Sequence, residues 1–217
     1  MNDLIEKVAQ FIHQKFKDNE GSHDWYHIER VWKLAKLIQQ SEGGDLLVIE
    51  LAALLHDVSD HKYNGGDWNK GSQLTKEILL NFNAPLELAE KVEKVVSQVS
   101  YKGARVTDSS DKLEARIVQD ADRLDAIGAI GIARAFAFGG SKNRPLYVPD
   151  LNPVLHQSAD EYKNSVSHTV NHFYEKLFLL KDRMHTVTAK NRAIDRHSFM
   201  EKFLNEFYNE WNLNRLK

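Results

Sequence analysis

The 217-residue chain has no cysteine, only 4 prolines, and almost no net charge. The absence of cysteine excludes disulfides, thiolate zinc sites and cysteine nucleophiles. With 29 Lys and Arg residues against 31 Asp and Glu residues, the formal net charge is −2. This balance argues against a surface for DNA or RNA duplexes and against a polybasic membrane arm. A pocket for a single nucleotide needs only local positive charge and is not excluded.

Long hydrophobic runs are also absent. The longest uncharged apolar stretch, residues 126–133, is far shorter than the roughly 20 residues that span a membrane. The first sixteen residues carry Asp3, Glu6 and Lys7 and contain no continuous apolar core of a signal peptide. We therefore expect a cytoplasmic protein without a membrane-spanning segment.

Apolar residues recur every three to four positions through most of the chain, which predicts helices with one buried face. No run of alternating β-branched residues predicts a strand. Helices are expected over residues 4–16, 25–38, 46–58, 67–82, 85–101, 111–138 with a kink or continuation through two glycines, 157–184 and 188–212. Residues 139–153 hold three of the four prolines and are expected to form a long loop. We predict one all-α domain over residues 1–217.

The most apolar of these segments, residues 46–58, contains a histidine and an aspartate side by side, His56 and Asp57. Burying an ionised carboxylate without a partner costs several kcal/mol, so such groups are usually paired or bound to a metal. A helix C-terminus is the alternative, in which His56 interacts with the helix dipole and Asp57 forms local hydrogen bonds. This segment alone does not decide between the two.

Polar residues also lie beside apolar faces in two other segments. Asp122 flanks the apolar face of the helix expected over residues 111–126, and His27 lies in the first turn of another helix. The alternative for the first of these segments is an ion-pair network on a solvated helix, formed by Asp120, Asp122, Arg123 and Asp125.

Taken together, three segments resemble the signature of the HD-domain phosphohydrolase superfamily: His-Asp-Trp-Tyr-His27-Ile-Glu-Arg-Val, Leu-Leu-His56-Asp57 and Asp-Ala-Asp122-Arg-Leu. The resemblance covers roughly residues 20–135 and extends into the C-terminal helices at about 157–212. It is strongest to small single-domain bacterial members, some of which are manganese-dependent nucleotide pyrophosphohydrolases. It implies a helical HD-domain fold of about 8–10 helices around a metal site.

The resemblance implies one divalent metal ion held by His27, His56, Asp57 and Asp122. Two imidazoles and two carboxylates suit Mn²⁺, Fe²⁺, Co²⁺, Ni²⁺ or Zn²⁺. We favour Mn²⁺, with Mg²⁺ among the alternatives. Such an ion polarises a phosphoryl group and lowers the pKa of bound water. We therefore count Asp57 as catalytic as well as metal-binding.

The predicted activity is hydrolysis of a small phosphorylated molecule, with a nucleoside triphosphate cut to monophosphate and pyrophosphate as the favoured reaction. The alternatives are another nucleotide phosphomonoesterase or phosphodiesterase reaction at the same site, or a non-catalytic nucleotide-binding regulatory module. A homodimer is compatible with the sequence, although no residue pattern supports one.

Charged residues after the His-Asp pair are candidates for catalysis and substrate binding. Asp60 or His61 is expected to orient the attacking water or protonate the leaving group, and Lys62 to contact phosphate. A solvated turn is the alternative for these three residues.

Two arginines flank the helix that carries Asp122. Arg123 and Arg134 are expected either to bind substrate phosphates or to pair with Asp125 and Glu114.

Overall fold

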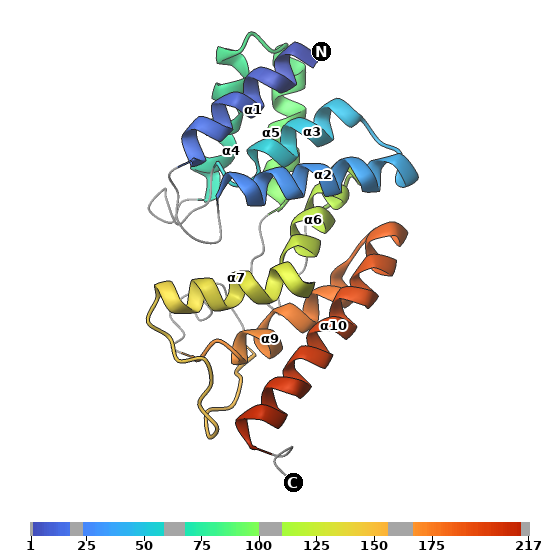
Figure 1. Ribbon diagram of the computed structural model, residues 1–217. Coiled ribbons are helices and arrows are strands. Elements are labelled where there is room, and N and C mark those ends of the chain that lie inside the picture. Colours follow the sequence, from blue (N-terminus) through green and yellow to red (C-terminus); the bar gives the residue numbers. More distant parts are fainter. Residues whose placement is uncertain (1, 18–23, 59–67, 100–109, 156–166, 214–217) are drawn as a thin grey trace.

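The computed structural model describes residues 2–17, 24–58, 68–99, 110–155 and 167–213 (Figure 1). Every regular element within these residues is helical, which confirms the all-α prediction. The helices are α1 (Asn2–Phe16), α2 (Trp25–Glu42), α3 (Leu46–Leu55), α4 (Trp68–Asn81), α5 (Leu86–Val99), α6 (Leu113–Asp125), α7 (Gly128–Ser141), α9 (Asn171–Glu175), the 3₁₀ helix η1 (Leu177–Arg183) and α10 (Val187–Trp211). Across the described ranges, none of the helices is both long enough and apolar enough to cross a membrane.

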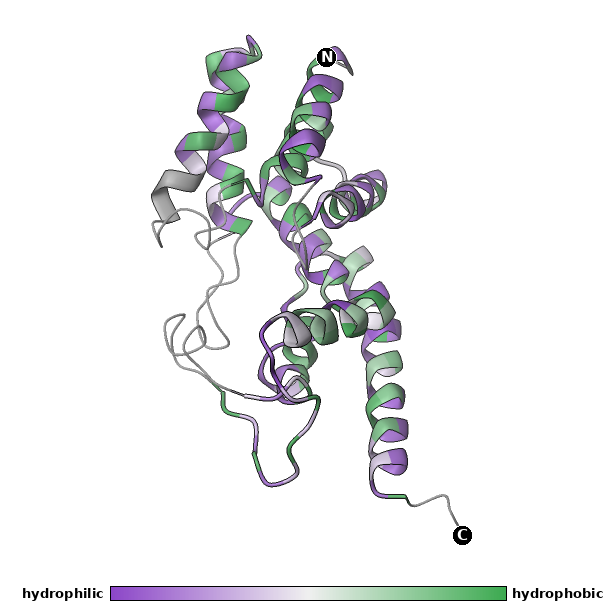
Figure 2. Ribbon diagram, turned by 60° about the vertical axis from the view of Figure 1, so that its left-hand side comes forward, coloured by the Kyte–Doolittle hydropathy of each residue, from purple (hydrophilic) through white to green (hydrophobic). Residues whose placement is uncertain are grey.

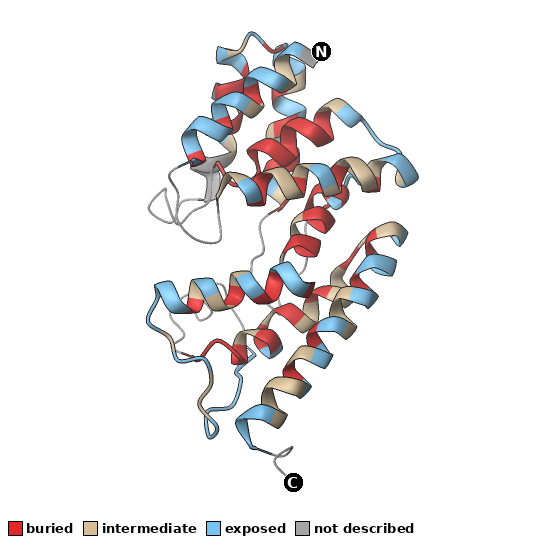
Figure 3. Cartoon of the chain, in the orientation of Figure 1, coloured by how far each residue is buried: buried red, intermediate tan, exposed pale blue. Residues whose placement is uncertain are grey.

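Helix α3 forms the centre of the core. Its residues from Val48 to Leu55 are all buried, as Figure 3 shows, and it packs against α1, α2, α5 and α6. Asp45 caps its N-terminus, because its side chain accepts hydrogen bonds from the backbone N–H groups of the second and third helical residues. A helix that is apolar on all sides is stable only when other elements surround it. The end of α3 is therefore held among the neighbouring helices.

Helix α3 ends at Leu55, three residues earlier than the sequence pattern predicted. The side chain of His56 donates from Nδ1 to the carbonyl oxygen of Ala53 at 2.7 Å. In a continuing helix that carbonyl would accept from the N–H of Asp57. His56 and Asp57 therefore lie in a turn that leaves the helix, and this turn brings their side chains to α2.

Helix α6 connects two parts of the molecule. In the view of Figure 1, α1 to α5 lie above it, and α7, α9 and α10 lie below it. The long helix α10 packs against α7, α6 and α2. Figure 2 shows hydrophobic and hydrophilic residues alternating along α10, as expected for a helix with one buried side.

The expected kink between α6 and α7 is a sharp corner at residues 126–127. Gly128 begins α7 with φ of +78°, a conformation that favours glycine. At Gly131, an added Cβ would lie only 2.2 Å from the backbone oxygen of Ala126. The corner therefore requires glycine at both positions, and it brings Arg134 of α7 next to Asp125 at the end of α6.

We expect the substitution Gly131→Ala to lower the free energy of unfolding by about 2 kcal/mol, because the new methyl group would push the two helices apart. Urea unfolding monitored by circular dichroism measures this change. Gly140→Ala is the matched control, since a Cβ at Gly140 of α7 meets nothing within 4 Å. There the helix propensity of alanine should leave stability unchanged or slightly higher. Equal effects of the two substitutions would contradict the steric argument.

The prediction of one long helix over residues 157–184 is wrong for the residues of this segment that the structure describes. Residues 157–166 lie outside the described part, and the remainder forms α9 and η1, with a break at Lys176 (φ −141°, ψ −59°). The side chain of Asn171 donates to the carbonyl of Leu151 and to the hydroxyl of Ser167. The bond to Leu151 ties the segment to the preceding loop, 20 residues earlier, and local apolar periodicity could not predict it.

Candidate metal centre

The four predicted metal ligands come from three helices that pack against one another. His27 lies in the first turn of α2, His56 and Asp57 follow the end of α3, and Asp122 lies in the last turn of α6. Helices α2, α3 and α6 are mutual neighbours. Asp24 begins α2, since its Oδ1 accepts from the backbone N–H of His27 at 2.8 Å. This N-cap contact fixes the backbone that carries His27.

The side chains of these residues converge on one point. The two Nε2 atoms of His27 and His56 lie 3.3 Å apart. Asp57 places one oxygen 3.3 Å from Nε2 of His27 and the other 3.5 Å from Nε2 of His56. Oδ1 of Asp122 lies 3.6 Å and 4.0 Å from the same two nitrogens. Ligands that share one transition-metal ion at about 2.1 Å lie about 3 Å apart, so modest side-chain movement would bring all four onto one ion.

The second nitrogen of each imidazole faces an acceptor. Nδ1 of His56 lies 2.7 Å from the carbonyl oxygen of Ala53, and Nδ1 of His27 lies 2.7 Å from Oδ2 of Asp125. A carbonyl or carboxylate oxygen only accepts, so each Nδ1 carries a proton and donates it. In the neutral imidazoles, both Nε2 lone pairs then point into the same space. Two Nε2 atoms 3.3 Å apart, with two carboxylates beside them, form a donor set that a divalent cation satisfies.

The electrostatic environment of His27 also favours a cation. Burial alone would lower the pKa of His27, but its hydrogen bond to Asp125 and the nearby Asp57 carboxylate raise it to about 9. Its side chain is only 1% exposed, so solvent screens these charges little. Without a metal, a proton on His27 offsets the negative charge of the cluster, and a divalent ion at Nε2 would replace that proton.

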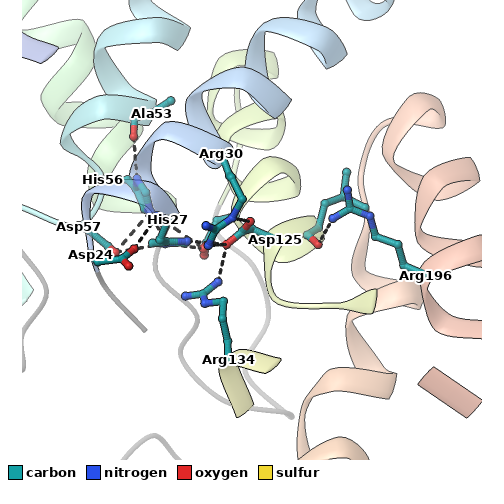
Figure 4. A network of polar contacts seen from close by, with 11 residues as sticks. Asp24, His27, Arg30, Ala53, His56, Asp57, Asp125, Arg134 and Arg196 are labelled. Atoms are coloured by element: carbon teal, nitrogen blue, oxygen red, sulfur yellow. Dashed lines mark hydrogen bonds and ion pairs between the residues drawn. The ribbon is translucent and has the colours of Figure 1, made fainter. Parts of the chain in front are cut away.

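Asp125 lies at the centre of a second group of contacts, which Figure 4 shows beside the histidines. Besides His27, it accepts from Nε of Arg30 on α2 at 2.6 Å and from a guanidinium nitrogen of Arg134 on α7 at 2.6 Å. Burial would raise the pKa of Asp125, but the hydrogen bonds from His27 and Arg30 hold it well below its usual range. The pairing of Arg134 with Asp125 was one of the two expectations for this arginine. The contact of Asp125 with His27 was not predicted, because 98 residues separate the two.

The solvated ion-pair network proposed as an alternative for α6 is wrong. Asp120 is fully buried and accepts hydrogen bonds from the backbone N–H groups of His185 and Thr186 at 2.9 and 2.8 Å. Burial is the main reason that the pKa of Asp120 is raised. The aspartates of α6 therefore have separate roles: Asp122 faces the two histidines, Asp125 contacts His27, and Asp120 ties α6 to the start of α10.

The other predicted site residues are placed differently. Arg134 contacts Asp125 as described, and its side chain is 18% exposed. Arg123 is buried and donates to the backbone carbonyl of Arg183, a placement that gives no support to the predicted phosphate contact. Asp60, His61 and Lys62 lie outside the described residues, so their roles stay predictions.

The comparisons with known proteins agree with this geometry. The family model of the HD domain matches residues 24–127, the segment that contains all four ligands. YpgQ of Bacillus subtilis is 36% identical over 202 residues, which cover 93% of this chain and 90% of that protein. The crystal structure of YpgQ in complex with ADP has a TM-score of 0.71 and 34% identity, over 95% of this chain and 97% of that chain.

Two other crystal structures extend the similarity over nearly the whole chain. A protein from Lactobacillus plantarum has a TM-score of 0.85 at 33% identity, over 98% of this chain and 99% of that chain. An HD-superfamily hydrolase from Bacillus thuringiensis has a TM-score of 0.74 at 39% identity, over 97% of this chain and 98% of that chain. With its matched domain, its convergent histidines and aspartates and these relatives, the chain belongs to the HD-domain family.

Proposed function

We propose that the protein is a metal-dependent phosphohydrolase that cuts a nucleoside triphosphate to a monophosphate and pyrophosphate. The observation that carries the proposal is the convergence of the two Nε2 atoms and the two carboxylates on one point. His27, His56, Asp57 and Asp122 would hold one divalent ion, with Mn²⁺ as the favoured metal. When bound, such an ion polarises a phosphoryl oxygen and lowers the pKa of a water molecule.

The side chains of the protein would position this chemistry. Asp57 contributes one of the two negative charges of the ligand set and lies within 3.5 Å of both imidazoles. The hydrogen bonds at Nδ1 hold both rings in place, so little reorganisation is needed when the ion and the substrate bind. Asp60 or His61 is proposed to orient the attacking water or to protonate the leaving group.

Two observations support a nucleotide as the substrate. YpgQ, which is similar to this chain over most of its length, has a crystal structure with ADP. In this chain, two arginines donate hydrogen bonds to the carboxylate of Asp125 and place positively charged groups beside the proposed metal centre. The side chains of these arginines, Arg30 and Arg134, are 33% and 18% exposed. We propose that Arg134, together with Lys62, attracts the phosphates of the substrate.

Product analysis tests this proposal. The purified protein is incubated with each NTP and dNTP and Mn²⁺, with EDTA in a parallel sample, and the products are separated by anion exchange. Monophosphate plus pyrophosphate, lost in EDTA, is the expected result. In water enriched in ¹⁸O, label in the monophosphate would place the attack on the phosphorus that is bonded to the ribose oxygen. Label in pyrophosphate would instead place the attack on the β-phosphorus.

Other products would redirect the proposal. Release of inorganic phosphate alone would indicate a phosphomonoesterase or a stepwise phosphatase. Intact nucleotides throughout the panel, with Mn²⁺ bound, would reject the pyrophosphohydrolase and leave another phosphoester substrate or a nucleotide-binding regulatory module. His27, His56 and Asp57 lie close enough together to share an ion, and Oδ1 of Asp122 lies 3.6 Å from Nε2 of His27. The presence of all four predicted ligands supports an enzyme over such a module.

A further inference from the structure

We propose that Asp125 is the positioning residue of the metal centre: it orients His27 and keeps the proton of that imidazole on Nδ1, and α10 holds Asp125 in place through Arg196. The inference rests on the proposed metal site, but it does not depend on which phosphorylated substrate the protein cuts.

The contact between Asp125 and His27 is buried on both sides. Their side chains are 2% and 1% exposed, and the oxygen and nitrogen lie 2.7 Å apart. A carboxylate can only accept, so this contact selects the tautomer whose Nε2 lone pair faces His56 and Asp57. Contacts of this kind orient the ring and increase the basicity of the coordinating nitrogen.

The two arginines immobilise the carboxylate of Asp125. Arg30 donates from Nε to Oδ1 at 2.6 Å and from its terminal nitrogen to Oδ2 at 3.1 Å. Arg134 donates to Oδ2 at 2.6 Å. Both oxygens are therefore engaged, and a rotation of the carboxylate away from His27 would break charge-assisted hydrogen bonds to two helices. As Figure 4 shows, Arg30 and Arg134 approach Asp125 from different sides.

The backbone beneath Asp125 is held by the C-terminal helix. Arg196 of α10 donates to the carbonyl of Leu124, the residue before Asp125. The aliphatic part of Arg196 packs on Gly128, where an added Cβ would lie 2.9 Å from its Cγ. Arg196 thus fastens α10 to the corner at which α6 ends. This contact gives α10, outside the segment with the metal ligands, an influence on the position of His27.

The two histidines differ in what orients them, and this difference makes the inference testable. His56 donates to the backbone carbonyl of Ala53, three residues earlier in the chain, whereas His27 depends on a side chain 98 residues away. A substitution at Asp125 should therefore disturb His27 and leave His56 unchanged. A general loosening of the fold would disturb both rings.

The test uses Asp125→Asn in the full-length protein. Asparagine is nearly isosteric, but it has no charge, and its amide can donate to Nδ1 as well as accept from it. In the zinc-loaded protein, imidazole ¹⁵N chemical shifts report which nitrogen of each ring carries a proton and which binds metal. We expect the shifts of His27 to change and those of His56 to stay. We also expect Mn²⁺ affinity, measured by electron paramagnetic resonance, to fall about 10- to 100-fold.

Variants on α10 test the second half of the proposal. Arg196→Ala should weaken Mn²⁺ binding by about threefold to tenfold, as expected for coupling through a packed contact. Arg192→Ala is the matched control, because Arg192 is an exposed arginine one turn earlier on the same helix. Equal Mn²⁺ affinities of the Arg196 and Arg192 variants would overturn the role of α10.

Two further measurements distinguish a misfolded variant, or a wrong proposed function, from a wrong role for Asp125. Circular dichroism establishes that Asp125→Asn is folded; if it is not, Arg30→Gln replaces it and should give a smaller shift change confined to His27. A folded Asp125→Asn protein with unchanged His27 shifts and unchanged Mn²⁺ affinity would overturn the proposal. A protein that binds Mn²⁺ as expected but hydrolyses no nucleotide would instead reject the proposed function and leave the role of Asp125 intact.

Discussion

Replacing Asp57 with asparagine is expected to lower metal-dependent hydrolysis by about a thousandfold, because a bound metal supplies several kcal/mol of transition-state stabilisation. Asp57 faces both coordinating nitrogens, at 3.3 and 3.5 Å, and carries half of the ligand charge. The neutral amide removes that charge and leaves Asp122 as the single anionic ligand. Initial rates over a range of Mn²⁺ concentrations, together with directly measured Mn²⁺ binding, would quantify the loss.

The matched control for this substitution is Asp182→Asn. It makes the same chemical change at a side chain that is 81% exposed and belongs to η1. The control protein should retain full activity and full Mn²⁺ affinity. The helical circular dichroism spectrum of Asp57→Asn should match that of the unchanged protein, since the substitution preserves shape. An Asp57→Asn protein that keeps both metal and activity would remove Asp57 from the proposed site.

The second large effect concerns the metal-free protein, whose stability should fall as the pH rises from about 6.5 to 9. The pKa of His27 is about 9 in the folded chain, against 6.5 in the unfolded chain. Between these values the folded state binds more protons than the unfolded state. The stabilisation from protonated His27 is therefore complete below pH 6.5 and is lost as the pH passes 9. This difference in pKa corresponds to a loss of about 3 kcal/mol in the free energy of unfolding.

Urea unfolding in EDTA at several pH values between 6 and 9.5 measures this dependence. The His27→Gln protein in EDTA is the control and should show a flatter profile. With Mn²⁺ bound, the decline between pH 7 and 8.5 should disappear, because the ion takes the place of the proton on His27. A metal-free protein whose stability is constant or rises over the full range would contradict the electrostatic account of His27.

The helical pattern of the sequence predicted most of the helices. Apolar residues at helical spacing form one face that is buried in the core, and this spacing can be read locally from the chain. The predicted end of the last helix, at residue 212, lies one residue beyond the observed end of α10 at Trp211. The prediction was wrong after residue 55, where the His56 side chain takes the carbonyl of Ala53, and again in the segment of α9 and η1. In the second case, the side chain of Asn171 binds the carbonyl of Leu151 in a loop 20 residues earlier, and such a bond has no signature in residue spacing.

The sequence by itself determined the all-α class and the four candidate ligands, because helical periodicity and the presence of polar residues in apolar segments are local properties of the chain. Only the tertiary structure decided what surrounds the ligands. It brought Asp125 of α6 to Nδ1 of His27, placed Arg30 and Arg134 on that carboxylate, and turned Arg123 toward the carbonyl of Arg183. These partners come from helices far apart in the sequence. They are brought together by the packing of α2 and α10 against α6 and by the glycine corner at which α6 turns into α7.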